Sequence, residues 1–317
     1  MNYAKFIYQT REFALQQNLI TRGDSLLISV SGGVDSVALL YFFQHIKSEF
    51  KLNLAVVHFD HQARLVSAND GLFVKELCHQ LDIKYYSYQK RFTGNNFQAN
   101  ASKWRKSLLT ELSKKEKFTK IALAHHLDDV AETVLWKIAR GSSLFGLNAM
   151  KISLGQVIRP FMCHYKKDII EYMSQQGYLW REDDTNQTND YTRNLIRNKL
   201  LVELDKIGKG RITLLDLARD SAELEEIYEQ MTKGIDISNP LLALDKLMVL
   251  PSLIAKELIG RYLTNQGVLD VNRAQIENLY REIKASSNRV RLIILSRGIS
   301  AKIDKNWLML TQKKGSP

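Results

Sequence analysis

Short apolar runs alternate with longer amphipathic segments through the first half of the sequence. Five of these runs have the length and the composition of buried strands, at residues 26–30, 54–59, 84–88, 121–124 and 157–159. Helices are predicted before and between them, near residues 1–20, 35–47, 66–81, 97–115 and 129–140. This alternation predicts an α/β fold with a doubly wound, Rossmann-like parallel sheet of five strands.

The pattern changes near residue 181. A polar, turn-like stretch leads into a basic segment that extends to residue 211, and apolar positions then recur every three or four residues as far as Met231. That period predicts a long amphipathic helix between two domains, with a helix packed wholly on one domain as the alternative. Residues 239–284 have helical character, and two strand-like pieces follow at 290–295 and 307–311. We therefore predict a first domain over residues 1–208, and a connecting helix with a small, mostly α domain over residues 209–317.

Composition and charge indicate a kind of partner and a compartment. Among the 317 residues, 45 are Lys or Arg and 34 are Asp or Glu, and the net charge of +11 favours a polyanionic partner such as nucleic acid. The two cysteines, Cys78 and Cys163, are far apart and form no Cys-x-x-Cys pair, which fits a reducing cytoplasm. The sequence shows no secretory leader and no apolar run long enough to span a membrane. We therefore expect a cytoplasmic protein with no membrane partner.

A Gly-rich segment separates the first predicted strand from the helix that follows it. Its residues are Ser31, Gly32, Gly33, Val34, Asp35 and Ser36. Paired glycines let the backbone bend and approach an anion, and the amide groups of the turn and of the helix N-terminus then point at that anion. The serines add hydroxyl donors, and Asp35 adds a carboxylate that can hold Mg²⁺. The segment predicts a phosphate site, with an ordinary capped turn as the alternative.

Two polar clusters follow the second and fourth predicted strands. One spans residues 58–64 and begins with His58, and the other spans residues 124–133, so both lie at the edge of the sheet where ligands bind. Taken alone, their His and Asp residues suit a dinuclear metal phosphohydrolase, or are strand-end residues with satisfied hydrogen bonds. In the second cluster, Asp129 and Glu132 lie three apart on one helical face. Such a pair can bind an ammonium group or a metal, or can simply interact with the helix dipole.

The Gly-rich segment resembles the pyrophosphate-binding loop of the PP-loop ATP-pyrophosphatases, which split ATP between its α and β phosphates. The order of the motifs carries the resemblance further. After the two clusters come motifs at residues 140–147, 159–160, 183–186 and 191–197. Over residues 25–200, the whole series closely resembles the tRNA(Ile)-lysidine synthetases, whereas beyond residue 210 the resemblance is only of length and helical character.

This resemblance implies a reaction. ATP adenylates the O2 oxygen of the wobble cytidine in a tRNA(Ile) with a CAU anticodon, and pyrophosphate leaves. The side-chain amine of free L-lysine then attacks carbon 2 of the base and AMP leaves, which gives lysidine. The implied cofactors are ATP and Mg²⁺, and a homodimer is compatible with the family because some members are dimers. Residues 1–208 would form the ATP-pyrophosphatase domain, and residues 209–317 would contribute to tRNA binding.

The resemblance also implies roles for individual residues. ATP would be held by the Gly-rich segment and by the histidine of the first cluster, that is by Ser31, Gly32, Gly33, Val34, Asp35, Ser36 and His58. Asp35 would also bind Mg²⁺. The catalytic residues would be Asp35, His126, Asp129 and Glu132, of which Asp129 and Glu132 would bind the lysine ammonium group. Contacts to tRNA or to phosphate would come from Arg105, Arg140, Arg193, Asn194 and Arg197.

One segment departs from the family's pattern. Residues 101–106 stand where the family usually has Ala-Arg-x-x-Arg-Tyr, and here Ser102 replaces the first Arg and Lys106 replaces the Tyr, whereas Arg105 is kept. Any role of the first Arg is therefore in doubt, and Lys103 could supply its charge.

Three other functions stay open. A PP-loop tRNA thiolase would need paired cysteines, a metal-dependent phosphohydrolase leaves the Gly-rich segment unexplained, and a non-catalytic RNA-binding module leaves the carboxylates unexplained.

Overall fold

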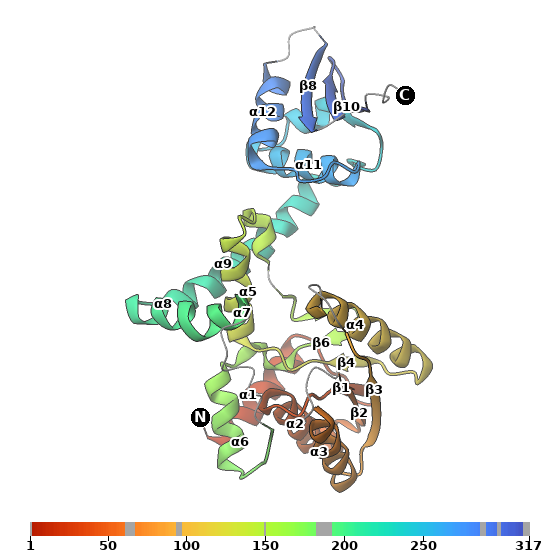
Figure 1. Cartoon of the computed structure of the whole chain (residues 1–317), viewed down its shortest axis with the longest axis vertical. Helices are drawn as coiled ribbons and strands as arrows, with labels where there is room; N and C mark the ends of the chain where they lie inside the picture. Colours follow the sequence, from red (N-terminus) through yellow and green to blue (C-terminus); the bar gives the residue numbers. More distant parts are fainter. Residues whose placement is uncertain are drawn as a thin grey trace. The chain divides into compact units, whose positions relative to one another are not determined.

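The computed structural model of the chain describes residues 2–60, 67–92, 97–148, 150–181, 192–285, 290–296 and 299–312. Contacts divide the chain into two compact units, residues 1–218 and 219–317. The boundary predicted after residue 208 lies a short way before this division, and helix α9 (Gly210–Met231) runs through it at the position of the predicted connecting helix. Figure 1 shows both units and labels most of their helices and strands.

The first unit is built on a six-stranded sheet with the order β3-β2-β1-β4-β6-β5. Its strands are β1 (Ser25–Ser29), β2 (Asn53–Asp60), β3 (Lys84–Gln89), β4 (Lys120–Ala122), β5 (Ser153–Leu154) and β6 (Val157–Ile158). All pair in parallel except β5, which pairs antiparallel with β6. The predicted parallel strands are confirmed, but the predicted total of five is wrong. Strand β5 was missed because it has two exposed residues and no apolar pattern.

Helices and short helical turns connect these strands. The α-helices are α1 (Tyr3–Gln16), α2 (Val34–Phe50), α3 (Ser67–Gln80), α4 (Phe97–Lys115), α5 (Leu127–Ala139), α6 (Lys166–Gln175), α7 (Thr192–Leu195) and α8 (Leu201–Ile207). The described residues of this unit also include the 3₁₀ turns η1 (Leu144–Leu147) and η2 (Pro160–Cys163) and a π-helical turn, η4 (Ile196–Leu200). The predicted helices are present within a few residues of their expected ends.

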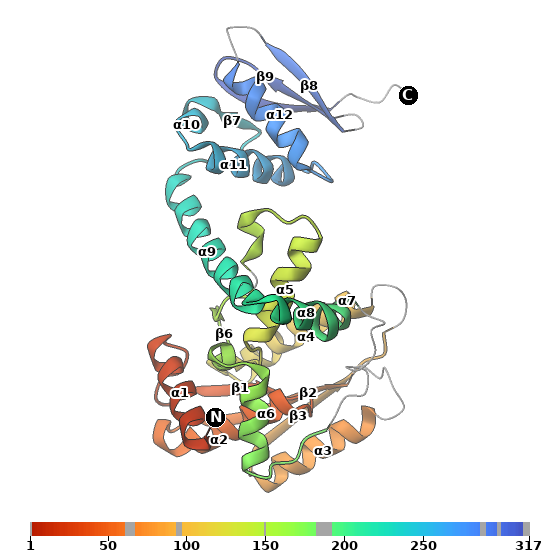
Figure 2. The same cartoon turned by 90° about the vertical axis from the view of Figure 1, so that its left-hand side faces the viewer.

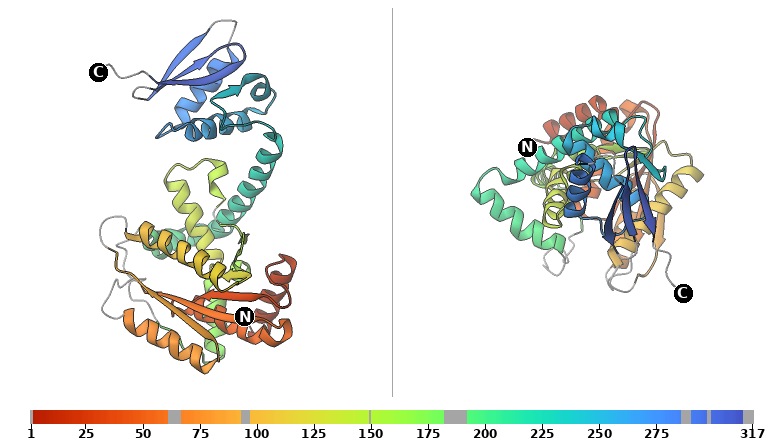
Figure 3. Two further views of the ribbon diagram at one scale, coloured as in Figure 1. Left: turned by 90° about the vertical axis from the view of Figure 1, so that its right-hand side faces the viewer. Right: turned by 90° about the horizontal axis from the view of Figure 1, so that it is seen from above.

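The sheet carries helices on both faces because its strands are apolar on both. Along β1, Leu26 and Ile28 enter one core, whereas Leu27 enters the other. Residues of α1, α2, α3 and α6 belong to the first core, and residues of α4 belong to the second. Figures 2 and 3 show α3 and α4 on opposite faces of the sheet. This is the doubly wound arrangement that the sequence predicts.

The direction in which strands are added reverses at β1. From β1 the chain adds β2 and β3 on one side, and then crosses over to add β4 and β6 on the other. Ligands of doubly wound sheets bind at such a reversal, beyond the carboxyl ends of the strands. Residues 30–33 follow β1, and residues 123–126 follow β4. The Gly-rich segment and the second polar cluster therefore meet at this point of the sheet.

Aromatic packing fixes helix α6 against α1. The ring of Phe6 stacks on Tyr172, with centroids 4.4 Å apart, and on His164, with centroids 4.2 Å apart. All three side chains are almost fully buried. Because large rings in such contacts contribute strongly to packing, the stack holds the beginning of α6 in place. The first residue of that helix is Lys166, which reaches the Gly-rich segment.

The second unit combines helices with a four-stranded antiparallel sheet of order β7-β10-β9-β8. After α9 come α10 (Leu244–Met248), α11 (Ser252–Asn265) and α12 (Arg273–Lys284), and the strands are β7 (Leu241–Ala243), β8 (Arg291–Ser296), β9 (Ile299–Ile303) and β10 (Trp307–Gln312). The helical character is as predicted, and the two strand-like pieces are β8 and β10. The sequence reading missed β7 and β9, which are short and find partners only in the folded sheet. Within the described ranges, no helix is both long and apolar enough to cross a membrane.

Candidate active site

The Gly-rich segment forms a turn that its own serines close. Oγ of Ser36 lies 3.1 Å from both the backbone nitrogen and the Oγ of Ser31, and it donates to the carbonyl oxygen of Gly33 at 3.0 Å. Helix α2 begins within the segment, at Val34, so its first amide groups have no partner within the helix and open at this turn. The turn therefore combines backbone donors with the positive end of a helix, as an anion site requires.

Gly32 is required by its backbone conformation. Its φ is +99°, in the region that favours glycine. Its carbonyl oxygen accepts a hydrogen bond from the backbone N–H of Arg181 at 2.9 Å. A Cβ on Gly32 would lie 3.6 Å from Val74 and 3.8 Å from Arg181, which are ordinary contact distances. The strained φ, and not lack of space, therefore accounts for glycine at this position.

The beginning of α5 forms the second half of the site. His126 is the N-cap of this helix, and its backbone N–H donates to Asp129 at 3.0 Å. The His126 ring is buried, with Nε2 3.5 Å from Asp129 and 3.8 Å from Asp35 of the Gly-rich segment. Burial lowers the pKa of His126, although Asp129 and Asp35 act in the opposite direction, so the ring is neutral at pH 7. Three of the predicted catalytic residues thus lie together.

The two carboxylates predicted to bind lysine, those of Asp129 and Glu132, both form ion pairs with the same side chain, Arg197. Nη2 of Arg197 lies 3.0 Å from Asp129 and 2.8 Å from Glu132. Glu132 is buried, whereas the Arg197 side chain is 41% exposed and reaches inward from the π-helical turn η4. Asp129 and Glu132 therefore act together on a cationic group, which in this structure is a guanidinium. Arg197, for which a tRNA or phosphate contact is predicted, forms ion pairs with both.

His58 lies within strand β2 and not after it. Its Nδ1 is 2.9 Å from the carbonyl oxygen of Val30, and its side chain is buried. A Cβ on Gly71 of α3 would lie 3.5 Å from the His58 ring, so the ring fills the space between β2 and α3. These contacts hold the residue that immediately precedes the Gly-rich segment. The rest of the first polar cluster beyond Asp60 lies outside the described residues.

The other predicted contacts to tRNA or phosphate lie in different elements of the first unit. Arg105 is an exposed residue of α4, and Arg140 is the C-cap of α5, with its guanidinium 4.8 Å from the Trp136 ring. Asn194 lies in α7 and is partly exposed, whereas the side chain of Arg193 lies outside the described part of the chain. The structure therefore joins Arg197 to Asp129 and Glu132. The contacts of the other four residues with tRNA or phosphate stay predictions.

Two basic residues at the site were missed by the sequence reading. Nζ of Lys166 lies 2.5 Å from Asp35, and its backbone N–H donates to Asp128 at 2.7 Å. The guanidinium of Arg211 pairs with the other carboxylate oxygen of Asp128. Neither residue belongs to a recognised motif. Lys166 reaches the site through topology, because α6 follows β6 and packs on α2, and no spacing in the sequence marks such a contact.

A second histidine at the end of β4 is held by the Arg159-Pro160 motif. Nε of Arg159 donates to Nδ1 of His125 at 3.2 Å, and another guanidinium nitrogen of Arg159 donates to the carbonyl oxygen of Lys151 at 2.7 Å. Burial lowers the pKa of His125 to about 4, and the charge of Arg159 acts in the same direction. His125 is therefore a neutral acceptor at pH 7 that orients Arg159.

The residues fit a magnesium ion that arrives with phosphate groups. Such ions take one or two carboxylates from the protein, with phosphates and water as the other ligands. Oδ1 of Asp35 is buried and has no hydrogen-bond partner among the described residues, so it can serve as such a ligand. In the described part of the chain, no three His, Cys, Asp or Glu side chains are arranged to hold a metal by themselves. The cluster of ligands that a dinuclear phosphohydrolase uses is therefore not found in this part.

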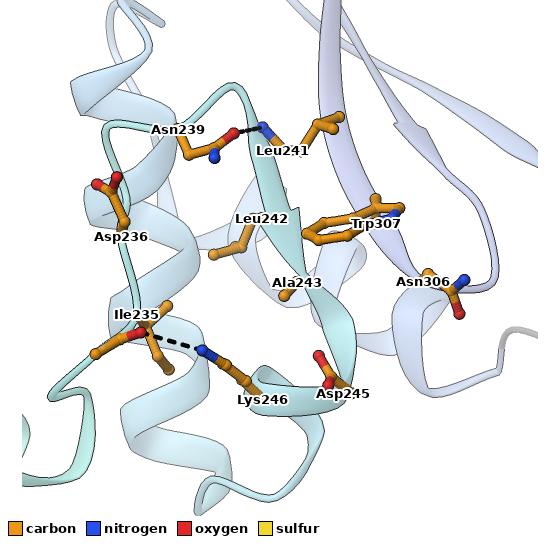
Figure 4. Close-up of a pocket in the computed structure, with 11 residues that line it drawn as sticks. Ile235, Asp236, Asn239, Leu241, Leu242, Ala243, Asp245, Lys246, Asn306 and Trp307 are labelled. Atoms are coloured by element: carbon orange, nitrogen blue, oxygen red, sulfur yellow. Dashed lines mark hydrogen bonds between the residues drawn. The ribbon is translucent and has the colours of Figure 1, made fainter.

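The second unit holds a separate pocket of about 430 Å³, shown in Figure 4. The side chains that line it include Asp236, Asn239, Asp245, Lys246 and Trp307. Asn239 accepts a hydrogen bond from the backbone of Leu241 at 2.9 Å, and Lys246 donates to the carbonyl oxygen of Gly234 at 3.2 Å. These polar groups stabilise the local turn, and the pocket contains no residue of the sequence motifs.

The fold and the site define a PP-loop ATP-binding protein. Residues 3–204 match the PP-loop domain family, which is more than half of the chain. The chain spans 81% of the tRNA(Ile)-lysidine synthase of Chlorobaculum tepidum, and the two are 30% identical over 80% of this chain. Within the PP-loop class, the chain belongs to the tRNA(Ile)-lysidine synthase family.

Other relatives match a smaller share of their length. The tRNA(Ile)-lysidine synthase of Clostridioides difficile is 36% identical over 59% of this chain, and that of Enterococcus faecalis is 34% identical over 56%. The chain spans only 42% and 40% of these two proteins. The chain therefore spans less than half the length of these two relatives.

A solved structure supports the fold. A U34-tRNA thiolase from Methanococcus maripaludis, determined with its [4Fe-4S] cluster, superposes with a TM-score of 0.57 and 18% identity. The match covers 71% of this chain and 80% of the thiolase. At this identity, the likeness is evidence for the fold alone and says nothing about the reaction.

Proposed function

We propose that this chain forms lysidine in a tRNA(Ile) with a CAU anticodon, as an ATP-dependent ligase that releases AMP and pyrophosphate. The proposal is carried by one observation: the Gly-rich turn after β1 and the carboxylate pair of α5 meet at the same end of the sheet, where Asp35 and Asp129 flank the His126 ring. The turn suits a polyphosphate, and the carboxylates suit an ammonium group. A ligase that activates one substrate with ATP and joins it to an amine needs both.

The Gly-rich turn supports the binding of ATP through its phosphates. The amide groups at the beginning of α2 and the hydroxyl groups of Ser31 and Ser36 would donate to phosphate oxygens. Asp35 would hold Mg²⁺, which when bound neutralises charge on the leaving pyrophosphate. His126 is neutral, so it can donate a hydrogen bond there without adding a charge.

Asp129 and Glu132 support the binding of lysine by its side-chain amine. Because Glu132 is buried, its charge is less screened than that of a surface carboxylate. An amine attacks only in its neutral form, so the group that binds the ammonium must also allow the loss of a proton. A carboxylate at hydrogen-bond distance can take that proton as a general base. The pair would therefore both select the amine and prepare it for attack.

Charge and exposure support an RNA partner. Helix α4 carries exposed basic side chains at Lys103, Arg105, Lys106, Lys114 and Lys115. Such a helix can replace counterions along a phosphate backbone, and unpaired anticodon bases can then be presented to the site. Further tRNA contacts in residues 209–317, a homodimer and a cytoplasmic location belong to this proposal as predictions.

The cysteines favour the ligase over a thiolase. Cys78 is buried in α3, and Cys163 is half-buried in η2, and both are free thiols. Burial raises the pKa of each thiol to about 12. Neither cysteine is therefore a thiolate near neutral pH, and sulfur transfer requires one.

The proposed function is tested by measuring pyrophosphate release from ATP and Mg²⁺, with and without L-lysine and a tRNA(Ile) transcript that carries CAU. We expect release that needs the tRNA and radiolabelled lysine that becomes attached to it. Release that needs the tRNA but transfers no lysine would keep the ATP chemistry and overturn lysine as the nucleophile. No release under any of these conditions would overturn the proposed function.

A further inference from the structure

Lys166 joins the two halves of the site. Its ammonium group lies 2.5 Å from Oδ2 of Asp35, in the Gly-rich segment, and its backbone N–H donates to Asp128, in the first turn of α5. The backbone is therefore fixed at one end, at the first residue of α6, whereas the side chain is 37% exposed. A long, flexible side chain that is anchored at its base and partly exposed to solvent can change its partner without moving the fold.

Asp35 has two carboxylate oxygens in different environments. Oδ2 is neutralised by Lys166, whereas Oδ1 is buried and has no hydrogen-bond partner within the described residues. Among those residues, the cationic groups that face Asp35 are the ammonium group of Lys166 and, when protonated, the His126 ring at 3.8 Å. The ammonium group of Lys166 therefore already compensates the negative charge of the Asp35 carboxylate, to which a divalent cation would bind.

We propose that Lys166 is an internal counter-ion that competes with the divalent cation for Asp35 and leaves this carboxylate when the cation binds. The inference rests on the proposed function, which assigns Mg²⁺ to Asp35. Two cations on one carboxylate repel each other, and a carboxylate that is already neutralised attracts a metal weakly. The lysine thus keeps the turn ordered without a metal and restricts metal binding to the ion that arrives with phosphates.

This competition predicts an effect on metal affinity in the absence of any substrate. Mn²⁺ replaces Mg²⁺ as the probe, because free Mn²⁺ gives an electron paramagnetic resonance signal that is lost on binding. With the full chain and no nucleotide, we expect Lys166→Met to bind Mn²⁺ about tenfold more tightly than the unaltered chain, which corresponds to about 1.4 kcal/mol. Lys166→Arg keeps the positive charge and should bind as weakly as the unaltered chain.

Two control variants locate the metal. Lys167→Met removes the neighbouring positive charge, whose ammonium group faces the Tyr165 ring at 5.7 Å, and should leave Mn²⁺ affinity unchanged. Adding Asp35→Asn to Lys166→Met should abolish the gain in affinity. Equal affinity for the unaltered chain and Lys166→Met would overturn the proposal, and so would a gain that persists without the Asp35 carboxylate.

A measurement on the unaltered chain keeps the test independent of any folding defect. Amine-specific labelling, quantified by peptide mass spectrometry, should modify Lys166 faster with millimolar Mn²⁺ than without it, and should modify Lys167 equally in both. Unchanged labelling of Lys166 at a Mn²⁺ concentration that saturates the chain would overturn the proposal that Lys166 leaves Asp35 when the cation binds. Because neither assay contains tRNA or lysine, a failure of lysidine formation with a positive Mn²⁺ result would refute the proposed function alone.

Discussion

Nε of Arg197 donates to a carboxylate oxygen of Glu132 at 3.0 Å, and Nη2 of the same guanidinium forms an ion pair with that oxygen at 2.8 Å. The two residues are far apart in the sequence, and Glu132 is buried in α5. A buried carboxylate is costly unless a cation or several donors compensate for its charge. The fold therefore holds Glu132 in α5 beside a cationic partner, together with Asp129, at the place where we propose that the lysine amine binds.

Glu132→Gln tests that proposal. The substitution keeps the size and shape of the side chain but removes the charge that attracts an ammonium group. We expect KM for lysine to rise about tenfold or more, since one such interaction contributes roughly 1.5–3 kcal/mol. KM for ATP should change less than twofold. Steady-state pyrophosphate release, measured against each substrate in turn, gives both values.

Glu203→Gln is the matched control for that experiment. Glu203 also forms an ion pair, with Lys206 at 2.7 Å, but both side chains are more than 60% exposed. Exposed pairs contribute little to stability, and this one is not part of the carboxylate pair of α5. The control should therefore leave both KM values unchanged. An unaltered lysine requirement in Glu132→Gln would refute the assignment of Glu132.

Asp35→Asn separates ATP chemistry from RNA binding. The amide keeps the shape of the carboxylate but is a poor ligand for Mg²⁺ and cannot balance the charge of Lys166. We expect pyrophosphate release to fall about a hundredfold or more, because stabilisation of the leaving group is lost. Binding of tRNA, measured by filter retention, should stay within twofold of the unaltered chain.

The control for that substitution is Asp82→Asn, at an exposed turn after α3 where φ is +50°. Asn tolerates this conformation as well as Asp does, so activity and folding should both be kept. If Asp35→Asn loses tRNA binding together with activity, a folding defect is indicated and the assigned role is not supported.

The sequence alone predicted the parts of the fold that have a local signal. Leu26 and Ile28 lie on one face of β1 and Leu27 on the other, and they belong to a continuous apolar run that is typical of a strand buried on both faces. The order of strands and helices also predicts that the turn after β1 lies close to the end of β4, because ligand sites of doubly wound sheets form beyond the carboxyl ends of neighbouring strands. Asp35, His126 and Asp129 could be grouped because each stands next to a predicted strand or turn.

What was missed depends on contacts between distant segments. Lys166 has no motif around it, and its contact with Asp35 exists because α6 packs on α2 in the folded unit. Arg197 likewise pairs with Glu132 only because the chain folds back on α5, and no local sequence pattern predicts this contact. Strand β5 has only two residues, both exposed, and β7 has only three residues, so neither has an apolar period long enough to detect.

Removal of both thiols tests the alternative of sulfur transfer. In Cys78→Ala with Cys163→Ala, we expect lysine transfer to stay within twofold of the unaltered chain. Cys78 is buried in the core, so its truncation should cost about 1 kcal/mol in the free energy of unfolding, as for the loss of one small buried group. The assay is the transfer of radiolabelled lysine, with thermal unfolding as the check on the fold. A folded double variant without activity would reopen a role for the thiols.

His164 should make the first unit sensitive to acid. Its side chain is buried, with Nε2 2.8 Å from the Thr10 hydroxyl, and burial lowers its pKa to about 4. In the unfolded chain its pKa is near the usual value of about 6.5. Above that pH, the residue is neutral in both states. As the pH falls below it, the unfolded chain takes up a proton and the folded chain does not, so the free energy of unfolding decreases until about pH 4.

His164→Gln should reduce this loss, since glutamine can still hydrogen-bond to Thr10 but does not titrate. Between pH 7.5 and pH 5, we expect the unaltered chain to lose about 2 kcal/mol more stability than the variant, in urea unfolding followed by circular dichroism. His79→Gln makes the same change at an exposed position and should follow the unaltered chain. Parallel pH profiles for His164→Gln and the unaltered chain would show that the buried ring is not the source of acid sensitivity.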